Sequence, residues 1–205
     1  AIDFGVPQDR TRFFLIGSRN QTEFLFPNTT GQRFTVDDAL RDLPPLPNGH
    51  STCWMKYGRK KPSVYAKKMR GSRKGCCNHL VTQNADIVLE RYSYVPQGGN
   101  WEDIPEDKMS NYADRSRCHT GIYHRLESTQ PSIVIGNFRK NMLIHPFEDR
   151  GLSVREAARL QSFPDSYEFV GSIGFQQQQV GNAVPPLLAK SVFASVLKAH
   201  KREAQ

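Results

Sequence analysis

Hydrophobic and polar side chains alternate near the start of the chain, where residues 10–16 read Arg-Thr-Arg-Phe-Phe-Leu-Ile between a proline and a glycine. A period of two predicts a strand, because successive side chains of a strand point to opposite faces. Gln8, Arg10 and Arg12 then share one face. Two guanidinium groups on one face repel each other, which indicates an acceptor from outside the chain, such as a phosphate or a base edge. The alternative is an ordinary surface strand with solvated arginines.

Helical periodicity predicts helices over residues 36–43, 84–94 and 153–163, and from residue 186 toward the C-terminus. The third is the clearest, because Ser153 and Glu156 have the spacing of a capping box. The last helix carries Leu188, Val192 and Val196 on one stripe and therefore needs a large apolar partner surface. The ordinary alternative is packing on its own domain.

The remaining pattern gives a mixed α/β chain. Short strands are predicted at residues 121–126 and 132–136, and a proline-rich linker follows residue 43. We expect three segments: a strand region with its connection over residues 1–45, a small irregular domain over 46–170, and a segment over 171–205 that packs back on the first.

The net charge of the chain adds a prediction about its binding partner. The 205 residues include 28 Lys and Arg against 20 Asp and Glu, a net charge of +8 that favours a polyanionic partner such as nucleic acid. The basic segment, as we call residues 56–74, contains nine basic residues and no acid. Its candidate DNA-binding residues are Lys56, Arg59, Lys60, Lys61, Lys67, Lys68, Arg70, Arg73 and Lys74. The alternative is a solvated, partly disordered loop.

Four cysteines do not form the paired framework of a small secreted domain, so reduced thiols are expected at Cys53, Cys76, Cys77 and Cys118. They lack a C-x-x-C spacing, and no metal is predicted. The sequence contains neither an apolar run long enough for a membrane span nor a start resembling a signal peptide. A soluble intracellular protein without a membrane partner is the expectation.

Three motifs occur in one order: G-V-P-Q-x-R-x-R-x-x-x-I-G at residues 5–17, L-S-V-R-E-A-A-R-L-Q-S-F-P within 150–165, and Q-V-G-N-A-V-P-P at 179–186. They resemble the eighth, ninth and tenth motifs of the DNA (cytosine-5)-methyltransferases, and the resemblance covers essentially the whole chain. It implies an edge strand and a C-terminal helix that complete a Rossmann-like methyltransferase domain, with a small α+β target recognition domain between them.

The resemblance also implies site residues. Gln8, Arg10 and Arg12 correspond to residues beside the flipped target cytosine of double-stranded DNA. The S-adenosylmethionine contacts correspond to Gly181, Asn182, Ala183 and Val184, in a predicted Gly-Asn turn. A threonine often stands in the family where this chain has Val134, so no recognition contact is transferred to that strand.

Other family motifs are missing from the chain: the Phe-x-Gly-x-Gly loop, the Pro-Cys-Gln nucleophile and Glu-Asn-Val. The four cysteines follow Thr, Gly, Cys and Arg rather than proline. We therefore expect the C-terminal half of the enzyme, inactive without a complementary N-terminal chain and forming a heterodimer with it. The alternative is a non-catalytic DNA-binding or regulatory subunit. The expected location is the cytoplasm, at the nucleoid, in a prokaryote and the nucleus in a eukaryote.

Overall fold

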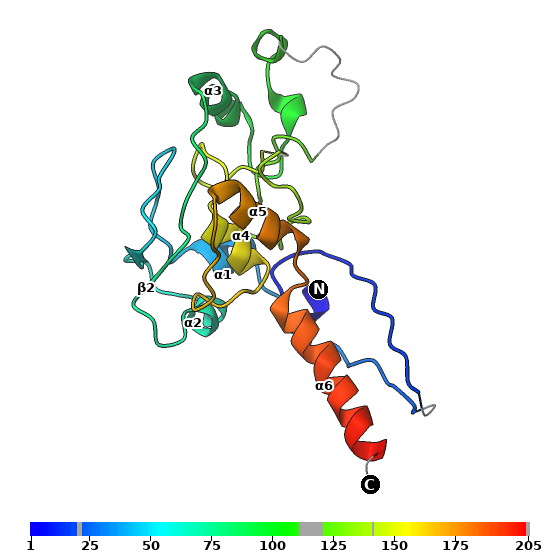
Figure 1. Cartoon of the computed structure of the whole chain (residues 1–205). Coiled ribbons are helices and arrows are strands. Elements are labelled where there is room, and N and C mark those ends of the chain that lie inside the picture. The colour runs from blue at the N-terminus through cyan, green and yellow to red at the C-terminus, as the bar shows by residue number, and fades with distance from the viewer. Residues whose placement is uncertain (20–21, 111–120, 141, 204–205) are drawn as a thin grey trace.

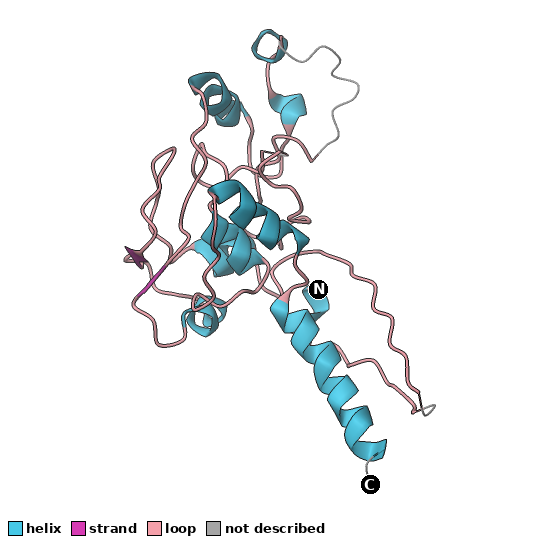
Figure 2. Ribbon diagram, in the orientation of Figure 1, coloured by secondary structure: helices cyan, strands magenta, loops and turns pink. Residues whose placement is uncertain are grey.

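The computed structural model describes residues 1–19, 22–110, 121–140 and 142–203, which form mixed helices with few strands (Figure 1, Figure 2). Within these residues the strands are β1 (Met55–Lys56) and β2 (Gly75–Cys76), an antiparallel pair with Met55 opposite Cys76. Trp54 lies against this strand pair, since a Cβ added at Gly75 would be 2.7 Å from the Trp54 ring. The architecture is therefore carried mainly by helices and long connections.

The main core lies among α1 (Val36–Leu40), α2 (Val64–Arg70), α4 (Val154–Leu160) and α5 (Ile173–Asn182). Its buried side chains include Val36, Leu40, Tyr65, Met69, Leu126, Ile135, Val154, Leu160 and Val180. These come from all three of the segments distinguished by sequence. Burial of apolar surface from distant parts of the chain is what holds the short helices in place.

Local capping explains where two of these helices begin. Thr35 and Asp38 exchange side-chain and backbone hydrogen bonds at the start of α1, and Ser153 and Glu156 do so at the start of α4. Both predicted helix starts are confirmed. The first helix is shorter than the predicted 36–43, because α1 ends at Leu40 and the chain turns before Pro44.

A second hydrophobic cluster surrounds α3 (Asp86–Tyr94), with η2 (Trp101–Asp103) and η3 (Glu106–Met109). Its buried members are Tyr92, Val95, Ile104, Met109, Tyr123 and Ile144. The predicted helix over 84–94 is confirmed within two residues. Figure 1 shows α3 at the top of the molecule, away from α6 (Pro186–Glu203).

Helix α6 extends away from the core, and the two parts of the N-terminal arm, residues 9–19 and 22–35, lie beside it (Figure 1). The start of the chain forms η1 (Ile2–Phe4), which contacts α6. Leu188 and Val192 are buried there, whereas Phe193 and Leu197 are 63% and 60% exposed. The described part of the chain has no single helix that is long and apolar enough to cross a membrane, although α5 and α6 together, bent by 44°, meet the length and composition required.

Within the described residues of this chain, the predicted strands do not form. Residues 10–16 and 132–136 form no ladder among the described residues; only Gln8 and Ser132 make an isolated parallel bridge. A strand needs a neighbouring strand to bond with its backbone, and the residues beside this segment do not supply one. The predicted strand at 121–126 is interrupted at Tyr123, whose φ of 52° is a left-handed conformation.

Candidate DNA and cofactor sites

Arg10 is buried at the base of the N-terminal arm, only 2% exposed. Its Nη1 donates to the carbonyl of Ile135 (2.8 Å), and its Nη2 donates to the carbonyls of Gly181 (2.7 Å) and Ala183 (3.3 Å). The prediction that the acceptor comes from outside the chain is therefore wrong for Arg10. Three backbone carbonyls, 125 to 173 residues away in sequence, surround its guanidinium instead.

The other two members of the predicted face differ from Arg10. Burial alternates as the pattern predicts, because Gln8 is buried and Arg12 half-buried while Thr11 and Phe13 are exposed. The Gln8 amide has no hydrogen-bond partner among the described residues, although it is fully buried. Arg12 donates from Nη1 to the carbonyl of Thr11 (3.0 Å) in an exposed position. Arg12 is thus the guanidinium of this face that a ligand can reach.

The predicted cofactor residues form a corner between α5 and α6, which we call the α5–α6 corner (residues 181–184). Gly181 and Asn182 belong to the last turn of α5 and Ala183 is its C-cap, so the predicted Gly-Asn turn is wrong and the break follows at residue 183. A Cβ at Gly181 would lie 2.2 Å from the Gly136 carbonyl oxygen, and only glycine permits this approach. Asn182 and Val184 are exposed.

The structure joins the first predicted site to the last. Arg10 holds two carbonyls of the α5–α6 corner, and Gln161 in the connection after α4 also donates to the carbonyls of Ile135 (3.3 Å) and Val180. The N-terminal arm therefore holds the corner directly through Arg10, and the segment that resembles the ninth motif holds the preceding turn of α5 through Gln161.

The basic segment is folded around α2 and is accessible along most of its length. The exposed basic residues are Lys56, Arg59, Lys60, Lys61, Lys67, Lys68, Arg73 and Lys74. Arg70 differs, because it stacks over the Tyr57 ring (3.8 Å to the centroid) and pairs with Asp42. Tyr65 is buried and donates to the Arg159 carbonyl (2.6 Å). Two tyrosines therefore pack the segment against the core, and eight cations remain at its surface.

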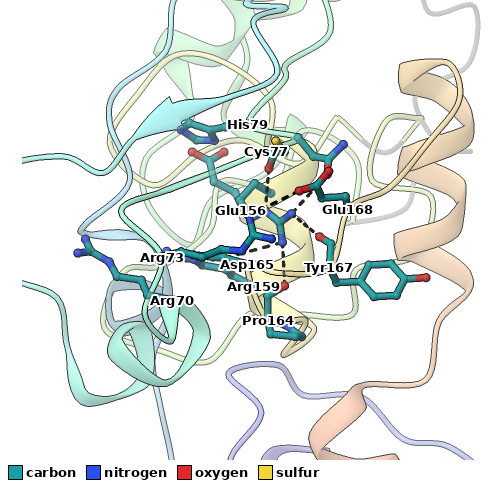
Figure 3. A network of polar contacts seen from close by, with 12 residues as sticks. Arg70, Arg73, Cys77, His79, Glu156, Arg159, Pro164, Asp165, Tyr167 and Glu168 are labelled. Atoms are coloured by element: carbon teal, nitrogen blue, oxygen red, sulfur yellow. Dashed lines mark hydrogen bonds and ion pairs between the residues drawn. The ribbon is translucent and has the colours of Figure 1, made fainter.

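Helix α4 carries two arginines, each with no exposed surface, that hold connecting segments (Figure 3). Arg159 donates to both Asp165 oxygens (3.0 and 2.6 Å) and to Asp42 Oδ1 (2.5 Å). Arg155 donates to the carbonyls of Cys77 (2.9 Å) and Tyr167 (2.6 Å). Burial alone would raise the pKa of Asp165, but the Arg159 guanidinium lowers it below its usual range. These contacts make α4 a buried scaffold without access to a substrate.

Two of the described cysteines, Cys76 and Cys77, are poor nucleophiles. Burial raises the pKa of the Cys76 thiol to about 12, and burial together with the neighbouring Cys53 raises that of Cys77 to about 11. Because the thiolate is the reactive form, neither thiol attacks efficiently at neutral pH. Cys118 lies outside the described residues. Among the residues with described positions, no group of three His, Cys, Asp or Glu side chains could hold a metal ion.

The fold is that of a DNA modification methyltransferase. A structure described as a putative enzyme of this kind, encoded within an Escherichia coli prophage, superposes with a TM-score of 0.73 at 23% identity over 98% of this chain and 58% of its own. The family model for C-5 cytosine-specific DNA methylases matches residues 1–198. The chain belongs to the C-5 cytosine-specific DNA methylase family.

Relatives include bacterial and plant proteins. Type II methyltransferase M1.HphI of Haemophilus parahaemolyticus is 37% identical over 99% of this chain and 47% of its own length. Type II methyltransferase M.XorII of Xanthomonas oryzae pv. oryzae is 31% identical over 100% of this chain and 50% of its own. DNA (cytosine-5)-methyltransferase 1B of rice is 34% identical over 76% of this chain. The chain thus spans about half the length of the bacterial relatives.

Proposed function

We propose that this chain is the DNA-recognition half of a DNA cytosine-5 methyltransferase and that a complementary part supplies the catalytic thiolate. The observation that carries the proposal is the combination of family membership with a match to about half of the bacterial relatives' length. The raised pKa values of Cys76 and Cys77 support it, because cytosine methylation at C5 needs a thiolate that adds to C6.

The complementary part docks on the N-terminal arm and α6. Phe13 and Leu15 are 88% and 87% exposed on one edge of an extended segment, and Phe193 and Leu197 are exposed on α6. Large apolar side chains at such exposure favour burial against a partner. The extended backbone at residues 10–16 can add to the edge of a partner's sheet by strand pairing. Arm and helix would then complete a Rossmann-like domain that is shared between the two parts.

The DNA is held through charge and positioned for chemistry by Arg12. The eight exposed cations of the basic segment suit the phosphate backbone. When they neutralise phosphates, counterions condensed on the DNA are released, and this release favours binding. Arg12 is accessible and contacts the extruded cytosine, whereas Gln8 is fully buried beneath the same face. Arg10 acts behind Arg12 by holding the α5–α6 corner.

The corner fits part of a cofactor site. Asn182 offers an accessible amide, and Val184 offers an apolar side chain that is 39% exposed, a combination suited to a ligand with polar and apolar portions. Bound S-adenosylmethionine would supply the methyl group for cytosine C5. The backbone of Gly181 and Ala183 keeps its position because Arg10 binds both carbonyls. The rest of the site would come from the complementary part.

The decisive experiment mixes this chain with a part carrying the Pro-Cys-Gln motif and measures transfer of labelled methyl groups to duplex DNA. Transfer is expected only from the mixture. The matched control replaces the cysteine of Pro-Cys-Gln with serine and should abolish transfer without preventing assembly. Methyl transfer by the isolated chain would refute the proposal that a complementary part supplies the catalytic thiolate. A mixture that assembles and binds DNA but never transfers a methyl group would favour a regulatory subunit.

Arg12→Ala tests the cytosine contact in the same mixture. Loss of one charged hydrogen bond costs on the order of 1.5–3 kcal/mol, which is roughly ten- to a hundredfold in rate or affinity. The control is Arg33→Ala, which removes an exposed arginine of the same arm whose partner is Asp3. Parental methylation and DNA affinity in Arg12→Ala would eliminate the assigned role.

A further inference from the structure

A cavity of about 530 Å³ lies between α5 and the connection at residues 136–140, outside every site assigned above except the corner that it borders. Its α5 wall consists of Gly174, Gln177, Gln178, Gly181 and Asn182. The spacings of three, four, seven and eight residues place all five on one face of the helix. Two glycines leave this face hollow, and three amides make it able to donate and to accept hydrogen bonds.

The opposite wall is cationic. Asn137, Arg139 and Lys140 line it, and the described residues provide no ion-pair partner for either cation. Both cations are exposed. Arg139 reaches across the cavity toward α5, because its Nη1 lies 3.3 Å from where a Cβ of Gly174 would be. None of the described lining residues is acidic, so an anion entering here meets cations and amide groups but no negative charge from them.

One buried acceptor on the α5 wall, the side-chain oxygen of Gln177, has no hydrogen-bond donor among the described residues. Gln177 is 5% exposed and its Nε2 donates to Thr82 Oγ1 (3.0 Å), which fixes the orientation of the amide. Its Oε1 is buried and has no donor among the residues that the structure describes. A buried acceptor without a donor is costly, and an amino group from a ligand would satisfy it.

We infer that this cavity binds one nucleotide of the DNA, with its phosphate toward Arg139 and Lys140 and its base amino group toward Gln177 Oε1. The inference rests on the proposed DNA-binding function and deepens it. Cations that are free of internal partners suit a phosphate, and amides in a hollow helix face suit the edge of a base. No residue of the basic segment lines the cavity, so this is a separate point of contact with the DNA.

The test compares two double variants, each of which replaces two cations with glutamine, in the assembly of this chain with its complementary part. Arg139→Gln combined with Lys140→Gln is measured beside Arg41→Gln combined with Lys108→Gln, which removes the same charge at two positions outside both the cavity and the basic segment. Duplex affinity is determined over a series of salt concentrations. The first pair should lower affinity roughly tenfold or more and flatten the dependence of log K on log salt by about 0.9, because both cations face one phosphate and each phosphate contact contributes about 0.9.

Single variants on α5 separate the cavity from general charge effects. Gln178→Glu places a carboxylate in the cavity, whereas Gln179→Glu places one on the next residue, which does not line it. We expect Gln178→Glu to weaken DNA binding severalfold more than Gln179→Glu does. Gln177→Met preserves side-chain volume but removes the acceptor, and it should reduce discrimination among duplexes of different sequence while keeping the salt dependence.

The possible outcomes separate the cavity site, its base contact and the proposed DNA-binding function. Parental affinity and salt dependence in the Arg139 and Lys140 pair would overturn the cavity site and leave the proposed function standing. Equal effects of Gln178→Glu and Gln179→Glu would also overturn it. Unchanged discrimination in Gln177→Met would remove the base contact. A parental assembly that binds no DNA would refute both the proposed function and this inference, since the second depends on the first.

Discussion

Arg10→Met is the substitution that best separates a positioning residue from one that contacts DNA. Methionine preserves much of the side-chain length and removes every donor. The carbonyls of Ile135 and Gly181 lose charged hydrogen bonds of 2.8 and 2.7 Å, and that of Ala183 loses a longer one of 3.3 Å. Hydrogen bonds to charged groups contribute about 1.5–3 kcal/mol each. Their sum is reduced because the parental protein also bears the cost of burying the guanidinium.

The net local destabilisation is therefore about 3 kcal/mol, which corresponds to a change of more than a hundredfold in the opening equilibrium of the α5–α6 corner. Amide hydrogen exchange at residues 181–184 should accelerate accordingly. Cofactor affinity should fall by roughly tenfold or more, while DNA affinity without cofactor stays within about threefold of the parental value. Arg10→Lys should fall between the two, because one ammonium cannot reach all three carbonyls as a planar fork does.

The opposite pattern would refute this reasoning. If Arg10→Met left hydrogen exchange and cofactor affinity at parental levels but lost as much DNA affinity as Arg12→Ala, then Arg10 would contact the DNA, as the family resemblance implies. The matched comparison with Arg12→Ala matters because both residues project from the same face of the arm.

Three further outcomes follow from the buried contacts. Arg159→Met should destabilise the chain by about 3–5 kcal/mol at pH 7 in urea unfolding, because buried Asp165 loses its bidentate ion pair and keeps only the Tyr57 hydroxyl and the more distant Arg155. The loss should be smaller near pH 4, where Asp165 can be protonated. Gly181→Ala should weaken cofactor binding in equilibrium titrations, since its Cβ would meet the Gly136 carbonyl at 2.2 Å. Burial lowers the pKa of His145 to about 4, so stability should fall as pH drops from about 6.5 toward 4. His145→Gln should remove that slope in the same urea assay, and a persisting slope would assign it to another group.

Helix starts were predictable because their chemistry is local. Ser153 with Glu156, and Thr35 with Asp38, lie within one turn of each other, so four residues are enough to specify the cap. The strands failed for the complementary reason. Alternation specifies which side chains share a face, and the burial of residues 8–13 follows it, but a ladder requires a partner strand from elsewhere.

The hydrogen-bond acceptors of Arg10 could not be predicted from the sequence, because they too come from distant parts of the chain. Backbone carbonyls carry no residue-specific signal, and the three that receive Arg10 lie at least 125 residues away. The family resemblance predicts cofactor contacts at residues 181–184, but it gave a turn where Gly181 and Asn182 are helical. Gln177 and Gln178 carried a signal that could have been used, because they lie in helical register with two glycines.

The second hydrophobic cluster, around α3, has a consequence for which parts of the chain can be exchanged during evolution. It encloses its own apolar side chains, and Arg125 joins it to the rest of the chain, donating to the carbonyls of Tyr92 (2.6 Å) and Val95 (2.6 Å) on one side and of His145 (2.9 Å) on the other. Because those acceptors are backbone atoms, they persist when side chains are exchanged. A unit fastened in this way can be replaced by one of different sequence, provided that the arginine and the backbone path around it are inherited together.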